Sequence, residues 1–269
     1  MGLIIVKPNK TLPLSITGGK CSLQCDHCRG HFLKGMASIY NIEKIQNHYY
    51  KSVLISGGFD LNGKLPYIPK NLLENLKKRG FKLNYHLGLV EERDIKDVLG
   101  LVDEVSFDFI LDEDIIENIF HLKKSSRDYK KTFELLREYF SVSPHIVLGL
   151  NNGKISKEYE AIEFLSKFEL PKIIFIIFTP IKDTPMENIS PPTIESLRKF
   201  FIFTKEKMPR VNLYLGCVRP KGDYRKNIDF LAYEIGFKAI VNPHPEVLEY
   251  LKKNNLVEDY FEECCAFLK

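Results

Sequence analysis

The segment Ile173–Phe178, with the sequence IIFIIF, is the longest uninterrupted apolar run in the chain. Successive residues of a strand point to opposite faces, so both faces of this segment are apolar. That pattern is typical of a parallel strand covered by helices on one side and by packed side chains on the other. A membrane-spanning helix needs about 20 apolar residues. The run therefore predicts a buried strand and no membrane span.

Seven other short runs share this character, at intervals of roughly 30 residues, which is the length that a strand–helix–strand unit needs. The predicted strands are Leu12–Thr17, Ser52–Ser56, Lys82–Leu87, Glu104–Phe109, His145–Leu150, Lys172–Phe178, Val211–Leu215 and Lys238–Val241. Segments with helical spacing and charged faces lie between them. The predicted helices are Asn41–Tyr50, Lys70–Arg79, Glu91–Leu101, Lys131–Phe140, Lys157–Phe168, Thr193–Met208, Asp223–Ile235 and Pro245–Asn254.

The alternation of strands and helices predicts an α/β fold with parallel strands. Eight units without a linker between them favour a single closed (β/α)₈ barrel of the TIM type over residues 1–269, with residues 244–269 as a C-terminal helical tail. An open, doubly wound sheet remains the alternative. In both folds ligands bind at the C-terminal ends of the strands, so the loops after the strands are the place to look for chemistry.

The composition excludes several classes of protein. Hydrophobic residues make up 44% of the chain and charged residues 28%, which is typical of a globular domain. The net charge of +4 is spread along the chain, so no nucleic-acid partner is predicted. Residues 1–10 carry only a short apolar patch and no signal-peptide cleavage pattern, so we expect a cytoplasmic protein. Six cysteines are too few for a disulfide scaffold in a chain of 269 residues.

Three of the cysteines, Cys21, Cys25 and Cys28, follow the first predicted strand in a C-x₃-C-x₂-C pattern. Three thiolates on a short loop can bind one soft metal centre, and on a four-iron cluster they leave one iron open. Two other interpretations remain: a zinc site completed by His27 or His31, and three small buried residues on one helix face.

This loop, the Gly57–Gly58 pair after the second predicted strand, and the barrel pattern resemble the radical S-adenosylmethionine (SAM) superfamily. The resemblance implies that Cys21, Cys25 and Cys28 hold a [4Fe–4S] cluster whose open iron binds SAM. It also implies an electron donor such as ferredoxin or flavodoxin, and a 5′-deoxyadenosyl radical that abstracts a hydrogen atom from a substrate. His27 occupies the position where the family often has an aromatic group near the adenine.

Other positions follow from their place on the predicted strands. Exposed backbone groups at Ser56, Gly57 and Gly58 are expected near the SAM ammonium. Ser106 and Asp108 alternate along one strand and so share one face, where they would meet a ribose or a substrate hydroxyl, or form an internal ion pair.

Two further positions are assigned by place alone. Asn151, after the fifth predicted strand, matches the family segment that contacts the SAM ribose and carboxylate. Thr179, after the sixth, matches the segment that lies against the adenine.

The seventh predicted strand leads into Cys217 and Arg219, two residues apart and therefore on one side of an extended segment. They are the predicted catalytic residues, with Arg219 expected to bind a carboxylate of SAM or of the substrate. Together with Cys264 and Cys265, Cys217 makes a second set of three cysteines. An auxiliary [4Fe–4S] cluster and a purely structural role are both open for this set.

The segments 15–36, 144–154 and 216–225 resemble a narrower group, the biotin-synthase-like proteins, which include one component of a two-protein lipoyl synthase. This resemblance implies sulfur insertion into an octanoyl chain on a lipoyl-carrier protein, with a second radical SAM protein as partner. Two alternatives remain open: a radical SAM enzyme that rearranges or cleaves carbon–carbon bonds, and a zinc-stabilised binding module on a barrel.

Overall fold

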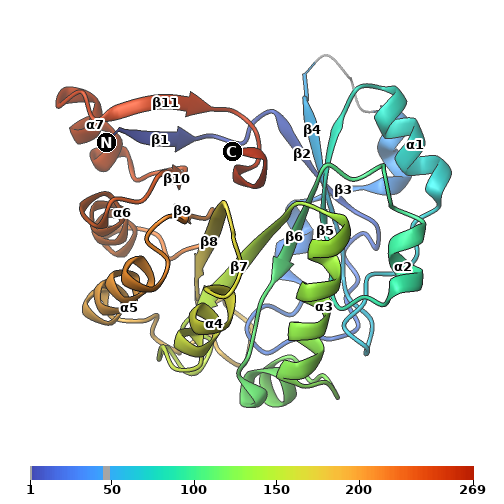
Figure 1. Cartoon of the computed structure of the whole chain (residues 1–269), viewed down its shortest axis with the longest axis horizontal. Coiled ribbons are helices and arrows are strands. Elements are labelled where there is room, and N and C mark those ends of the chain that lie inside the picture. Colours follow the sequence, from blue (N-terminus) through green and yellow to red (C-terminus); the bar gives the residue numbers. More distant parts are fainter. Residues whose placement is uncertain (1, 45–48) are drawn as a thin grey trace.

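A computed structural model describes residues 2–44 and 49–269 of the chain. Within this part, one parallel sheet curls around its own interior and the helices lie on its outer side (Figure 1). The strands are β1 (Leu3–Val6), β2 (Thr11–Ser15), β3 (Ala37–Ser38), β4 (Ser52–Ser56), β5 (Lys82–His86), β6 (Glu104–Asp108), β7 (Val142–Leu148), β8 (Lys172–Ile177), β9 (Asn212–Leu215), β10 (Ala239–Val241) and β11 (Val257–Phe261). The α-helices are α1 (Lys70–Lys78), α2 (Glu92–Lys96), α3 (Ser126–Tyr139), α4 (Glu158–Leu165), α5 (Ile194–Lys207), α6 (Asp223–Ile235) and α7 (Pro245–Lys253).

The predicted α/β fold is confirmed, and all eight predicted strands are present as β2 and β4 to β10. The helices predicted from residue 70 onward are also present, although α2 is much shorter than its predicted range of 91–101. The first predicted helix, 41–50, begins as a 3₁₀ helix at Ile39–Lys44, and the rest of it falls partly outside the described residues.

Three strands were not predicted: the two-residue β3 and two strands at the ends of the sequence. The apolar patch near the N-terminus is β1, which is fully buried between β10 and β11. The segment predicted as a helical tail is helical in α7 and then forms β11, so the prediction of a helical tail over 244–269 was wrong in its second half. The middle three residues of β11 are exposed and polar or amphipathic, which hides the strand from a search for apolar runs.

The sheet forms a partial barrel. Its strand order is β11-β1-β10-β9-β8-β7-β6-β5-β4-β2-β3, and in the described residues β1 and β2 are not paired with each other. The C-terminal segment lies beside this gap, as Figure 1 shows, where the amide of Lys10 donates to the carbonyl of Glu262 and the amide of Cys264 donates to Thr11 Oγ1. The C-terminal segment thus occupies the position where β1 and β2 would be hydrogen-bonded to each other in a closed barrel.

A buried ion pair inside the barrel holds the C-terminal segment in place. Lys172 Nζ lies 3.6 Å from Glu104 Oε1, and both side chains are almost fully buried. The same ammonium donates to the carbonyls of Ala266 and Leu268. A buried ammonium is stable only when it is paired and hydrogen-bonded, so Lys172 ties the C-terminal segment to the first residues of β8 and β6.

The described residues contain no helix that is both long and apolar enough to cross a lipid bilayer.

Candidate active site

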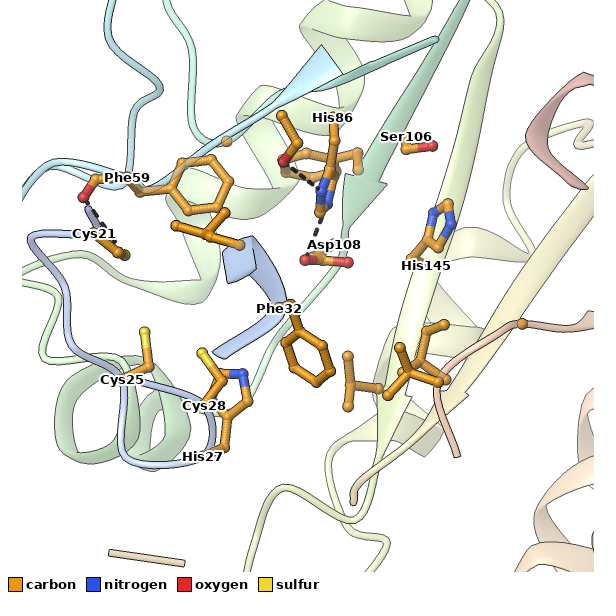
Figure 2. Close-up of a pocket in the computed structure, with 18 of the residues that line it drawn as sticks. Cys21, Cys25, His27, Cys28, Phe32, Phe59, His86, Ser106, Asp108 and His145 are labelled. Atoms are coloured by element: carbon orange, nitrogen blue, oxygen red, sulfur yellow. Dashed lines mark hydrogen bonds and ion pairs between the residues drawn. The ribbon is translucent and has the colours of Figure 1, made fainter. Parts of the chain in front are cut away.

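A cavity of about 520 Å³ lies inside the curled sheet. Most of its lining is apolar, and the part of the chain that the structure describes places no lysine or arginine along it. Figure 2 shows the cysteine loop on one side of the cavity and the polar residues of β5, β6 and β7 on the other. The cysteine and polar lining residues are Cys21, Cys25, His27, Cys28, Ser56, His86, Ser106, Asp108, His145, Thr179, Cys217, Cys264 and Cys265.

The cysteine loop is held from two sides by backbone hydrogen bonds. The amide of Ser22 donates to the carbonyl of Phe59, in the loop after β4, over 3.0 Å. The amide of Asp26 donates to the carbonyl of Ile119, in the π-helix Ile115–Ile119, over 2.9 Å. His121 Nε2 lies 3.0 Å from Asp26 Oδ1 and adds a side-chain contact on that side. The loop is therefore fixed by segments that come after β4 and β6.

The loop backbone is unusual and closely packed. Gln24 and Arg29 have φ angles of 47° and 43°, in the left-handed region that side chains other than glycine rarely adopt. Gly58 has no room for a side chain: a Cβ there would lie 2.0 Å from the carbonyl oxygen of Lys20 and 2.4 Å from the Cα of Cys21. Strained backbone of this kind persists where the surroundings impose it and is concentrated at functional sites.

Two of the three loop thiols interact directly. A hydrogen bond with the Cys25 thiol is the main cause that lowers the pKa of Cys28 to about 4, and the neighbouring His27 lowers it further. The same contact and burial raise the pKa of Cys25. Cys28 is thus a thiolate at neutral pH, which is the form of cysteine that binds metals.

The third thiol points elsewhere. Cys21 Sγ lies 3.9 Å from the carbonyl oxygen of Phe59, and Figure 2 shows it apart from the other two sulfur atoms. Consequently, no three cysteine, histidine or carboxylate side chains within residues 2–44 and 49–269 are already close enough to hold one metal ion.

The donor set nevertheless fits an iron–sulfur cluster. Three soft sulfur donors from one short loop line the same cavity, and one of them is already ionised. His27 Nδ1 is buried and has no hydrogen-bond partner, and its ring lies against Phe120 with 5.3 Å between ring centroids. An unpaired buried nitrogen is costly, so this atom is available to a group bound beside the loop.

The two glycines predicted to contact SAM, Gly57 and Gly58, lie in different environments. Ser56 and Gly57 line the cavity, as expected for a ligand contact. Gly58 does not line it, since it packs against the cysteine loop and its amide donates to Thr17 Oγ1 over 2.7 Å. The prediction of a direct contact for Gly58 therefore needs correction, because the residue supports the loop instead.

Ser106 and Asp108 share the inward face of β6, as predicted, and each has a partner on β5. Ser106 Oγ is within 3.1 Å of both polar atoms of the Asn84 side chain, so its hydroxyl proton is already used. Asp108 Oδ2 lies 3.1 Å from His86 Nε2. The internal ion pair that the sequence left open is thus present, and Asp108 Oδ1 remains free for a ligand.

Thr179 and Asn151 were assigned only from their positions in the sequence, and only one of them lines the cavity. Thr179 lines the cavity, although its hydroxyl donates to the carbonyl of Ile177. Asn151 does not line it. Its amide lies in a turn 3.4 Å from Asp112 Oδ2, where it stabilises the loop after β7, so the predicted contact with SAM needs correction.

Arg219 also needs correction, because its side chain is fully buried outside the cavity. Its Nε lies 2.7 Å from Asp229 Oδ1, and its other nitrogens donate to the carbonyls of Gly216 and Asn242. Three of its five N–H donors are therefore used, and the fully buried side chain is not accessible to a ligand in the cavity. The guanidinium connects the loop after β9 to α6. It therefore stabilises the loop that carries Cys217.

Because Arg219 has this structural role, we expect removal of its partner Asp229 to destabilise the protein. Asp229→Ala would leave the guanidinium buried and unpaired, so we expect the free energy of unfolding to fall by about 3–5 kcal/mol. Urea denaturation measures the change. Glu234→Ala, which breaks the exposed pair with Arg198, is the matched control and should cost less than about 1 kcal/mol. Equal losses in the two variants would contradict a structural role for the buried pair.

The second set of cysteines lines the same cavity from the other end of the sequence. Cys217 is exposed, Cys264 is half-buried and Cys265 is buried. Contact with Cys265 is the main cause that lowers the pKa of Cys264 to about 7, and Asn84 Nδ2 lies 3.6 Å from its sulfur. Although Cys217 is exposed to the cavity, desolvation by the surrounding protein raises its pKa, and the negative charge of Cys264 raises it further.

Sequence reasoning missed two residues of the cavity, His86 and His145. Asn84 and His86 alternate on β5 as Ser106 and Asp108 do on β6, and this pattern was the available signal. His145 is the register partner of Asp108 on β7.

The chain resembles known proteins in structure and not in sequence. No protein-family model matches it, and no characterised protein matches its sequence. Methylornithine synthase (PylB) superposes with a TM-score of 0.63 at 12% identity, covering 89% of this chain and 72% of that one. SuiB of Streptococcus suis bound to S-adenosylmethionine superposes with a TM-score of 0.56 at 16% identity, covering 80% and 51%. The chain thus spans about half the length of SuiB.

An HMG-CoA lyase from Brucella melitensis superposes with a TM-score of 0.57 at 10% identity, covering 97% of this chain and 93% of that one. At such identities the similarity shows that these proteins share the curled parallel α/β fold. One fold supports many kinds of chemistry, so the function has to be argued from the site.

Proposed function

We propose that this protein is a radical SAM enzyme. The observation that carries the proposal is the position of Cys21, Cys25 and Cys28: they occupy the loop after β2 and line a cavity at the C-terminal ends of the strands. That end of a parallel barrel is where active sites form. The shared fold with SuiB, which was solved with S-adenosylmethionine bound, supports the same assignment.

In this proposal Cys21, Cys25 and Cys28 hold a [4Fe–4S] cluster. When bound, the cluster supplies the electron that cleaves SAM to methionine and a 5′-deoxyadenosyl radical. The chain contributes position and shielding: Ser56 and Gly57 line the SAM side of the cavity, and His27 offers its ring and an unpaired Nδ1 beside the loop. Apolar side chains such as Phe59 and Phe120 exclude water, which protects a radical from side reactions.

The finer proposal is sulfur insertion of the lipoyl synthase type. Its support is that Cys217, Cys264 and Cys265 line the same cavity as the first three cysteines, so a sulfur source held there would face the radical site across the substrate. An aliphatic octanoyl chain suits the mostly apolar lining. The proposal includes an auxiliary cluster on these cysteines, an octanoylated carrier protein as substrate, and ferredoxin or flavodoxin as electron donor.

Iron and sulfide analysis after anaerobic reconstitution tests both levels of the proposal. About eight irons per chain are expected for two clusters, and about four for the SAM-binding cluster alone. Cys217→Ser should lower the iron content by about four and leave the cleavage of SAM to 5′-deoxyadenosine measurable by chromatography. An unchanged iron count in this variant would remove the argument for sulfur insertion.

Two outcomes separate the proposal from its alternatives. A colourless protein that binds zinc and no iron would contradict radical SAM chemistry and favour the binding module. SAM cleavage with a product that contains no new carbon–sulfur bond, detected by mass spectrometry, would favour a rearrangement or a carbon–carbon cleavage.

A further inference from the structure

Three polar side chains form a cluster in the mostly apolar cavity. His86, Asp108 and His145 come from the neighbouring strands β5, β6 and β7, and Figure 2 shows them on the opposite side of the cavity from the cysteine loop. The centroids of the two histidine rings are 6.1 Å apart. None of the chemistry assigned to the cysteines accounts for these two histidines.

The hydrogen bonds within the cluster fix which atoms remain free. His145 Nδ1 lies 3.0 Å from the carbonyl oxygen of Ser143, so Nδ1 carries the proton and Nε2 presents a lone pair. Asp108 uses Oδ2 to bind His86, and Oδ1 has no partner among the described residues. His86 Nδ1 lies 3.3 Å from Ser56 Oγ, which leaves neither of its nitrogens free. The two open atoms, His145 Nε2 and Asp108 Oδ1, are both acceptors.

The charges around His145 keep this arrangement stable at neutral pH. Burial lowers the pKa of His145 to about 4, with the cations His86 and Lys172 acting in the same direction and the Asp108 carboxylate acting against them. For His86, burial lowers the pKa, but the charge of Asp108, the hydrogen bond to Asp108 and the charge of Cys264 together outweigh burial, so the pKa is raised. The cluster thus combines a hydrogen-bonded His86–Asp108 pair with a neutral His145 imidazole.

We propose that His145 Nε2 and Asp108 Oδ1 form a substrate-binding site that selects an apolar molecule carrying an uncharged hydrogen-bond donor, such as an amide N–H or a hydroxyl group. An apolar group at this point would leave two acceptors without partners, which costs free energy. A carboxylate would bring a third acceptor and a negative charge next to Asp108. With no lysine or arginine along the cavity in the described residues, that charge would have no cation to pair with. An ammonium group is disfavoured because the mostly apolar lining would leave part of its charge and its N–H donors without partners.

The inference rests on the proposed function, because it assigns the head group of the substrate in the same cavity. It is tested by binding and not by turnover. The protein is reconstituted anaerobically with iron and sulfide and kept without reductant, and three probes with the same chain length are titrated by calorimetry at pH 7.5: octanamide, N,N-dimethyloctanamide and octanoate.

Octanamide should bind about tenfold more tightly than the dimethyl compound, which lacks the N–H donor, and octanoate should bind no better than the latter. His145→Phe keeps an aromatic ring but removes the acceptor, so it should erase the preference for octanamide. His145→Gln retains an acceptor and should keep part of it. Equal affinity for octanamide and the dimethyl compound in the unmodified protein, tight binding of octanoate, or a preference that survives in His145→Phe would each overturn the inference.

The outcomes remain separable from those of the proposed function. A protein that loads iron and cleaves SAM but shows no preference among the probes would retain the radical SAM assignment and lose the head-group site. A protein that binds no iron but prefers octanamide would retain the head-group site and lose the radical SAM assignment. The first comparison needs only the unmodified protein, so the test stands even if His145→Phe does not fold.

Discussion

Cys28→Ser is expected to abolish SAM cleavage. Cys28 is the loop cysteine whose pKa is lowered to about 4, and a serine hydroxyl in its place is neither ionised nor soft at neutral pH. Loss of a direct ligand should reduce 5′-deoxyadenosine formation at least about a hundredfold, since removing even an outer partner of a metal site costs about 10–100-fold. The measurements are iron per chain after reconstitution and 5′-deoxyadenosine by chromatography.

Ser22→Ala is the matched control for this variant. Ser22 lies in the same loop, its side chain is exposed, and only its backbone amide holds the loop, by donating to Phe59. The control should load iron as the unmodified protein does. If Cys28→Ser loaded the same amount of iron and formed 5′-deoxyadenosine at the unmodified rate, the three-cysteine site would be wrong.

Gly58→Ala is expected to prevent the loop from adopting its structure, although it adds only a single methyl group. The new Cβ would overlap the carbonyl oxygen of Lys20 and the Cα of Cys21, both of them backbone atoms. Neither can move by a change of rotamer, so the segment that carries Cys21 must shift. Forcing extra atoms into packed structure costs about 1–3 kcal/mol. We expect a loss of that size in urea denaturation, together with a loss of most of the iron.

Gly19→Ala provides the comparison within the same segment. A Cβ at Gly19 meets no atom within 4 Å, so this variant should keep its stability and its iron. The measurements are the iron content and the midpoint of unfolding, each compared between Gly58→Ala and Gly19→Ala. Similar behaviour of both variants would mean that the close approach of Gly58 to the loop has no consequence.

The sequence was sufficient to predict the parts of the structure that repeat. β4 was predicted to the residue because a buried parallel strand is apolar on both faces and is followed here by two glycines. β8 was predicted to within one residue, since IIFIIF suits no exposed element. By contrast, β1 has only four residues, and β11 is an edge strand with an exposed, charged middle, so neither carries a signal that distinguishes it from a loop.

The site was predictable where one segment supplies the chemistry and not where distant segments meet. The spacing of Cys21, Cys25 and Cys28 is local, and it identified the loop. The partner of Arg219 is Asp229 on α6, and no local pattern shows that this pair is buried outside the cavity. Similarly, the role of Gly58 depends on contact with Lys20 and Cys21, which only the folded chain brings close.

The pairing of β1 also constrains how the chain folds as it is synthesised. Ile4 pairs with Ala239 on β10, and the other edge of β1 pairs with β11, so β1 has no partner until these two later strands have been synthesised. Contacts between residues so distant in sequence slow folding, because a long loop must close before they form. An apolar LIIV strand with both edges open is a site for wrong pairing during that interval. We therefore expect the nascent chain to depend on chaperones until β10 and β11 have left the ribosome.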